Sequence, residues 1–155
     1  MRLRDAVGFP QCPEGLDAVV ALKDSTKDLF QMGETIRRTR DRLTIFVGLE
    51  PYAVPAVLLG ARGIVAMAPN ILGAEAAGFY RAIATGEWDR VRVLQGKLSR
   101  LYEGFYAPGR AAYTVIKEAM NLLGRPGGFP RPPLLPLDPA DRDELRGLLR
   151  DLGAL

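Results

Sequence analysis

The sequence predicts an α/β fold in which parallel strands come first and a set of helices follows. Up to Asn70, short β-type runs alternate with helical runs, and this β-α-β-α-β order implies parallel strands joined by right-handed crossovers. After Asn70 no strand signal remains. The strand runs are apolar on both faces, as in a sheet covered by helices, and three strands alone would leave two edges open. We therefore expect these strands to be part of a larger sheet.

The strand and helix signals of the first part can be placed in order. The three expected strands are short apolar runs bounded by glycine or polar residues: Ala18–Leu22, Leu43–Val47 and Ile64–Met67. Between the first two, Leu29–Arg42 has apolar residues at helical spacing, and Ser25 or Thr26 is its expected cap. Pro51–Leu59 is expected to form a short helix that begins with a proline and stops at Gly60.

The second part of the chain is predicted to be helical. Its expected helices are Ala74–Thr85, Asp89–Phe105, Arg110–Leu123 and Asp138–Leu152. Asp138 is the expected cap of the last helix. A Gly/Pro-rich link, Gly124 to Pro136, precedes it, and its Pro130–Pro133 stretch is interpreted as a structural connector rather than an SH3-type ligand, because it joins two helices. We place the domain boundary between the strand region, residues 1–73, and the helices, residues 74–155.

Composition excludes several classes of function. The 155 residues are 48% apolar and 25% charged, which is typical of one globular domain. The chain has no histidine, so neither a Ser-His-Asp nor a Cys-His mechanism is available, and the single Cys12 allows no internal disulfide or cysteine-based zinc site. We expect no metal and no cofactor. The net charge of +3 is spread along the chain, which does not favour nucleic-acid binding.

The expected location is the cytoplasm. The longest apolar stretches are interrupted by glycine, proline or charge well before a bilayer could be spanned, so no membrane association is expected. The first ten residues contain Arg2, Arg4 and Asp5 and are not expected to form a signal peptide.

Lys23 is the strongest candidate for chemistry. It directly follows the first strand run and precedes Asp24-Ser25-Thr26. Its amine is therefore expected at the carboxyl end of the sheet, where α/β enzymes place their active sites. A desolvated amine has a lowered pKa and attacks ketones to form a Schiff base. The alternative is a lysine that ends an edge strand and reaches into solvent.

Several ordered segments resemble one known family. Val19–Thr26 resembles the Schiff-base segment of the dihydrodipicolinate synthase / N-acetylneuraminate lyase family. Phe46–Glu50 is similar to the family's seventh strand and the turn after it, and Leu59–Asn70 to its eighth strand. Gly128–Pro133, followed by Pro136-Leu137, is most similar to the 2-keto-3-deoxygluconate aldolase branch. The resemblance runs from about Leu16 to the C-terminus, which corresponds to the C-terminal half of such an enzyme.

The resemblance implies a fold and a set of site residues. The fold would be α/β, a partial TIM (β/α)8 barrel made of the last three βα units and followed by a C-terminal helical region. Lys23 would be the catalytic lysine that forms an imine with pyruvate. Gly48 would let substrate approach the backbone, Glu50 would contact a polyol group, and Val65 and Ala66 would present backbone groups to the keto acid. Ordinary alternatives are a simple turn at Gly48, a solvated carboxylate at Glu50 and core packing at the last two.

The chain departs from the family pattern in one important way. Strands one to five are absent from it, and with them the Gly-x-Thr-Gly-Glu loop and the tyrosine that relays protons; all five tyrosines of this chain follow Lys23. The first hypothesis is a Schiff-base-forming lyase, aldolase or synthase that acts on pyruvate and an aldehyde, or on a 2-keto-3-deoxy sugar acid. It would need a complementing N-terminal half or a homo-oligomer, and little turnover is expected from this chain alone. The alternative is a non-catalytic remnant that acts as an oligomerisation or interaction module.

Overall fold

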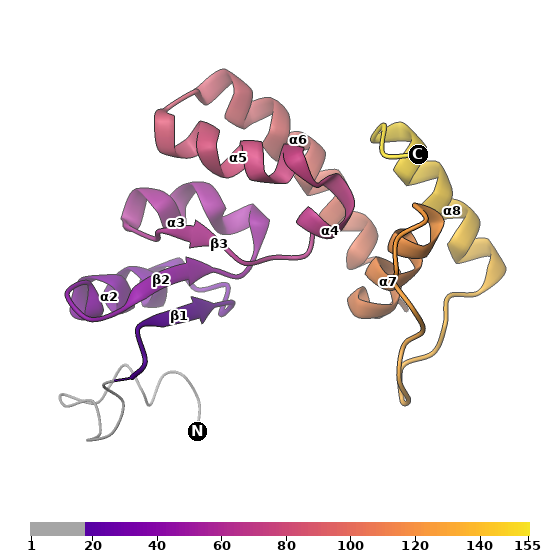
Figure 1. Ribbon diagram of the computed structural model, residues 1–155, viewed down its shortest axis with the longest axis horizontal. Helices are drawn as coiled ribbons and strands as arrows, with labels where there is room; N and C mark the ends of the chain where they lie inside the picture. Colours follow the sequence, from indigo (N-terminus) through magenta and orange to yellow (C-terminus); the bar gives the residue numbers. More distant parts are fainter. Residues whose placement is uncertain (1–17) are drawn as a thin grey trace. The chain divides into compact units, whose positions relative to one another are not determined.

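The computed structural model describes residues 18–155, and Cys12 lies outside them. The chain consists of two compact units, Met1–Val65 and Ala66–Leu155. The first unit contains the parallel sheet and the second is helical (Figure 1). This order of strands first and helices afterwards confirms the predicted α/β class, whereas the predicted domain boundary after residue 73 stays a prediction.

The sheet of the first unit is fully parallel. Its strands are β1 (Ala21–Asp24), β2 (Thr44–Val47) and β3 (Gly63–Ile64), hydrogen-bonded in the order β1-β2-β3. In the register, Lys23 lies opposite Phe46, and Phe46 lies opposite Gly63. Sequential parallel neighbours require a crossover between each pair, and α2 (Leu29–Thr39) and α3 (Ala53–Leu59) supply them.

The strand limits differ from the expected ones. β1 begins at Ala21 rather than Ala18 and continues past Leu22 to include Lys23 and Asp24, because these residues pair with β2. β3 ends at Ile64 rather than Met67. Its last link to the sheet is the bond from the Val65 N–H to the Val47 carbonyl at 2.9 Å, and β2 ends at Val47, so the ladder has no further partner.

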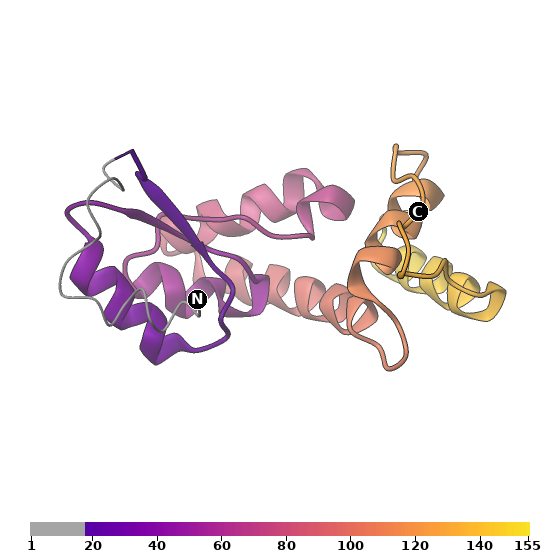
Figure 2. The ribbon, with the colours of Figure 1, turned by 90° about the horizontal axis from the view of Figure 1, so that it is seen from below.

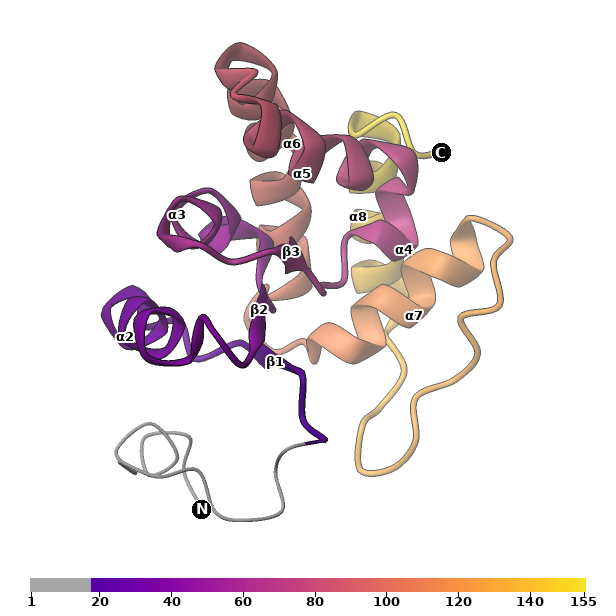
Figure 3. The same ribbon diagram turned by 60° about the vertical axis from the view of Figure 1, so that its left-hand side comes forward.

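Helices α2 and α3 contact each other and lie on the same side of the sheet (Figure 3). The prediction that Ser25 or Thr26 caps α2 is wrong. The cap is Asp28, whose carboxylate accepts a hydrogen bond from the Gln31 N–H at 2.9 Å. Pro51 belongs to a 3-10 turn, η1 (Glu50–Tyr52), that precedes α3. Gly60 ends α3 with a φ of 115°, a value that favours glycine.

The second unit is a set of packed helices. They are α4 (Pro69–Leu72), α5 (Ala74–Thr85), α6 (Trp88–Phe105), α7 (Ala112–Leu122) and α8 (Pro139–Asp151). The contacts join α5 to α6, α4 to both α5 and α7, and α7 to α8; Figure 2 shows the last pair. Fully buried Phe79, Leu101, Phe105 and Leu149 form much of the core. Asp138 caps α8 as predicted, since its carboxylate accepts from the Asp141 N–H at 2.8 Å.

The link between α7 and α8 is tied to α7. The Lys117 amine donates to the Gly127 carbonyl at 2.8 Å, and the Asn121 side chain both donates to and accepts from the Gly128 backbone at 3.0 Å. The Thr114 hydroxyl donates to the Leu135 carbonyl at 3.1 Å. These bonds support the interpretation of the Gly/Pro-rich link as a structural connector.

Candidate functional site

The two faces of the sheet differ in what covers them. Side chains alternate along a strand, so Leu22 and Asp24 share one face of β1 while Ala21 and Lys23 share the other. Asp24 is completely buried, which indicates that the first pair is on the face covered by α2 and α3. Lys23 is exposed on the opposite face. The sheet therefore presents Lys23 at the carboxyl end of β1, away from the helices of its own unit.

Gly48 makes room for the Lys23 side chain. It directly follows β2, and its N–H donates to the Asp24 carbonyl at 2.7 Å. A Cβ atom on Gly48 would lie 2.7 Å from Lys23 Cε and 1.8 Å from Ser25 Oγ, both far inside contact distance. The side chains of Lys23 and Ser25 thus lie together over the Gly48 backbone, which only glycine permits.

Two residues beside Lys23 were not among the predicted site residues. Ser25 follows two positions later, and this spacing puts it on the same side of extended chain as Lys23. Phe46 is the register partner of Lys23, and its ring lies over Gly63: a Cβ on that glycine would be 2.8 Å from ring atoms Cδ1 and Cε1. Parallel pairing was predicted, but only the register identifies Phe46 as the neighbour.

The remaining predicted site residues have unlike environments. Glu50 is only 3% exposed, so the alternative of a solvated turn carboxylate is wrong. Val65 is 47% exposed and stays attached to β2 through its N–H, so it is not a core residue. Ala66 is half-buried and is the first residue of the second unit. The structure therefore brings Lys23 and Gly48 into contact, with Glu50 two residues beyond Gly48 along the chain.

The other described lysines are placed differently from Lys23. Lys97 forms an ion pair with Glu75, and the Lys117 amine binds the Gly127 carbonyl. Lys27 is exposed and lies in the turn before α2 with a φ of 64°.

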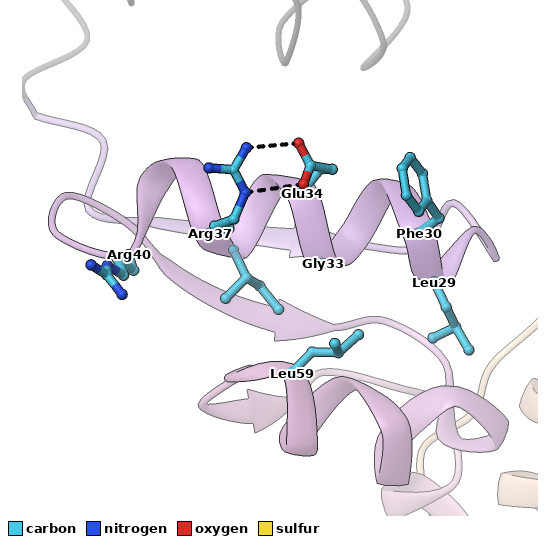
Figure 4. A pocket seen from close by; sticks show the side chains of 8 residues that line it. Leu29, Phe30, Gly33, Glu34, Arg37, Arg40 and Leu59 are labelled. Atoms are coloured by element: carbon cyan, nitrogen blue, oxygen red, sulfur yellow. Dashed lines mark hydrogen bonds and ion pairs between the residues drawn. The ribbon is translucent and has the colours of Figure 1, made fainter.

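A groove of about 440 Å³ lies elsewhere on the same unit, along α2 and α3 (Figure 4). Gly33 and Leu59 line it, and so does the ion pair in which the Arg37 guanidinium donates to Glu34 at 2.9 and 3.0 Å. This pairing with Arg37 lowers the pKa of Glu34 to about 2. None of the predicted site residues lines the groove, so it is separate from the Lys23 site.

Two searches of the described part of the chain were negative. Residues 18–155 contain no cluster of histidine, cysteine and carboxylate residues suited to a metal ion. Among their helices, none combines the length and the apolar character needed to cross a bilayer.

Comparisons with known proteins agree on one family. The chain is 38% identical over 136 residues to an uncharacterized DapA-like lyase of Rhizobium meliloti, covering 88% of this chain and 45% of that protein. It is 33% identical to a 4-hydroxy-tetrahydrodipicolinate synthase of Thermomicrobium roseum, covering 84% of this chain and 43% of that one. A solved structure of dihydrodipicolinate synthase from Bacillus anthracis matches with a TM-score of 0.79 at 29% identity, covering 88% of this chain and 46% of that one.

The chain spans about half the length of the curated relatives it matches. Its three parallel strands are consistent with a part of the fold found in the matching synthase structures, of which it covers about 46%. The family model of the dihydrodipicolinate synthetases matches residues 14–152, nearly the whole sequence. The chain therefore belongs to the dihydrodipicolinate synthetase family.

Proposed function

We propose that Lys23 is the Schiff-base lysine of a lyase or synthase that acts on pyruvate and an aldehyde. The observation that carries this proposal is the position of Lys23 at the carboxyl end of a parallel strand, with its side chain over Gly48 beside Ser25. Lys97 and Lys117 are engaged by other groups, which leaves them poorly suited to the same role.

The proposed covalent step needs only the lysine amine and a ketone. The neutral Nζ of Lys23 attacks the keto carbon of pyruvate, a C–N bond forms, and the carbonyl oxygen takes up one proton from the amine and one from solvent. Loss of that oxygen as water leaves the imine, whose positive nitrogen draws electrons from the neighbouring carbon. Loss of a proton from that carbon to solvent gives an enamine, which can form a carbon–carbon bond to an aldehyde; the reverse sequence cleaves an aldol.

The other predicted residues are proposed to shape this site. Gly48 provides the space above the backbone that Lys23 already occupies, and substrate bound to the amine would approach the same glycine. Glu50 lies close by along the chain and is proposed to contact a polyol group of the substrate. Val65 and Ala66 are proposed to offer backbone groups to the keto acid.

The described residues do not enclose the site. Lys23 is exposed, whereas an imine-forming amine has to be kept neutral by a dry pocket. We propose that further strands cover this face, supplied by a complementing N-terminal half, and that the assembled protein is a homo-oligomer. Relatives about twice as long as the matched region support this proposal.

One segment of the sequence supports a specific substrate class. The Gly128–Pro133 segment resembles the 2-keto-3-deoxygluconate aldolase branch, so a 2-keto-3-deoxy sugar acid is proposed as the substrate of the cleavage direction. The names of the relatives, a DapA-like lyase and a 4-hydroxy-tetrahydrodipicolinate synthase, support the broader class of lyase or synthase.

Borohydride trapping tests the proposal directly. The chain is incubated with pyruvate and borohydride, alone and together with the complementing N-terminal half of a relative, and peptide mass spectrometry locates the reduced adduct. We expect the adduct on Lys23 when that half is present. We expect Lys23→Ala to abolish it, while the matched Lys27→Ala, four residues away and also exposed, keeps it. An adduct that is spread equally over Lys27, Lys97 and Lys117 would remove the assigned role of Lys23.

The exposed sheet face also favours the second candidate function, a non-catalytic interaction module. Val65, at 47% exposed, is an apolar residue on this face that a partner would cover. Under this hypothesis no pyruvate adduct forms on Lys23, even when the complementing N-terminal half of a relative is added. An adduct under either condition favours the enzyme.

A further inference from the structure

We propose that Asp24 is a positioning residue that holds Lys23 and Ser25 over Gly48; this rests on the proposed Schiff-base function. Asp24 is the last residue of β1 and is completely buried on the face opposite Lys23. It therefore cannot touch a substrate bound to the Lys23 amine, and any influence on that amine has to pass through the backbone.

The Asp24 carboxylate closes the turn that leaves β1. Its Oδ1 accepts hydrogen bonds from the Thr26 N–H at 2.8 Å and from the Thr26 hydroxyl at 2.7 Å. Ser25 lies between these two residues, so its direction is set by this closed turn. The following Lys27 adopts a φ of 64°, a left-handed conformation that is unfavourable for residues other than glycine and needs support from the surrounding turn.

The same residue joins the turn to β2. The Asp24 carbonyl accepts the Gly48 N–H at 2.7 Å, so the backbone that carries Lys23 and Ser25 is tied to the glycine beneath their side chains. The side chain of Asp24 thus holds the turn that contains Ser25, and its main chain holds Gly48 at the end of β2.

Only one carboxylate oxygen takes part. Asp24 Oδ2 is buried and accepts no hydrogen bond from residues 18–155. An asparagine keeps Oδ1 as the acceptor for Thr26 while it removes the charge. Positioning therefore predicts that Asp24→Asn is tolerated and Asp24→Ala is not, whereas a role in proton transfer predicts that both fail.

The test uses NMR on the full chain, followed by borohydride trapping after the complementing N-terminal half of a relative has been added. In the unsubstituted protein we expect a nuclear Overhauser contact between the Lys23 ε-protons and the Gly48 α-protons. It should vanish in Asp24→Ala and persist in Asp24→Asn. The matched control is Asp28→Ala, which removes a carboxylate that also accepts a nearby backbone N–H, from Gln31, but caps α2 instead.

Trapping rates complete the experiment. We expect about a 10-fold or larger loss of pyruvate trapping in Asp24→Ala, because misplacing a reacting group by an ångström has effects of this order, and less than about 3-fold change in Asp28→Ala. Thr26→Val keeps the backbone N–H but loses the hydroxyl donor, so it should weaken both the Lys23–Gly48 Overhauser contact and the rate of pyruvate trapping. This variant provides the test if Asp24→Ala does not fold. A Lys23–Gly48 contact that survives unchanged in Asp24→Ala, or in Thr26→Val in that case, overturns the proposal. If the Lys23–Gly48 contact responds as expected but pyruvate is never trapped, Asp24 positions Lys23 and the proposed Schiff-base function is wrong.

Discussion

Replacing Gly48 with alanine is the most direct perturbation of the candidate site. The backbone at this position is not in the left-handed region, so alanine is conformationally acceptable and only the added methyl group matters. That methyl would stand 1.8 Å from Ser25 Oγ, 2.7 Å from Lys23 Cε and 3.0 Å from Ser25 Cβ. Lys23 can swing its flexible end away, but Ser25 has to move its Cβ and hence its backbone.

The expected loss of stability in Gly48→Ala follows from these distances. An added methyl in a filled space costs about 1–3 kcal/mol when neighbours shift, and the backbone of the Ser25 turn places Gly48→Ala within that range. We expect a lower free energy of unfolding in urea and loss of most pyruvate trapping at Lys23. The matched control is Gly96→Ala in α6, where a Cβ meets nothing within 4 Å. It should stabilise the protein by about 0.5–1 kcal/mol and leave trapping unchanged.

A double-mutant cycle isolates the cause. Ser25→Ala removes the oxygen that is nearest to the new methyl, so the combination Ser25→Ala/Gly48→Ala should be more stable than the sum of the single changes predicts. The reasoning is refuted if Gly48→Ala unfolds at the same urea concentration as the unsubstituted chain and still traps pyruvate at Lys23.

Three further predictions concern other parts of the chain. Arg37 lowers the pKa of Glu34 to about 2 from an ordinary 4.5, so the ionised Glu34 carboxylate stabilises the fold above pH 4.5 and this stabilisation is lost as the pH falls toward 2. Acid titrations of Glu34→Gln should therefore show a smaller loss of stability between pH 4.5 and 2 than the unsubstituted protein shows. An identical loss would contradict the prediction. Arg110 lies just before α7 and bonds to Glu144 and Asp141 of α8, which raise its pKa. Arg110→Met should lower the free energy of unfolding, measured by denaturant titration, by about 1–3 kcal/mol. An unchanged free energy of unfolding would exclude a stabilising role. In the described part of the chain, β1 and β3 are sheet edges and one sheet face carries no helix of its own unit, so sedimentation should show a homo-oligomer at micromolar concentration; a stable compact monomer would count against it.

Local signals determined much of the helical part. The limits of α5, Ala74–Thr85, follow from an amphipathic pattern that ends at Gly86, whose φ of 74° closes the helix. Asp138 and Pro139 begin α8 as predicted, because capping and the first turn depend on a few neighbouring residues. The parallel order of the strands was predictable for a similar reason, since alternating strands and helices leave few other topologies.

The candidate site was predictable only in part. The sequence by itself determined that Lys23 follows an apolar strand and that a glycine, Gly48, follows the next one. Strand pairing decided the rest: the register set Phe46 beside Lys23, and the end of β2 stopped β3 before Met67. Asp28 caps α2, while Thr26 donates to Asp24 in the preceding turn. Several neighbouring polar residues fit the local pattern of a helix cap, so that pattern does not single out Asp28. Hydrogen bonds between residues on different elements, such as the one from the Gly48 N–H to the Asp24 carbonyl, leave no signal in a local pattern. Tertiary structure alone therefore decided what surrounds the Lys23 amine.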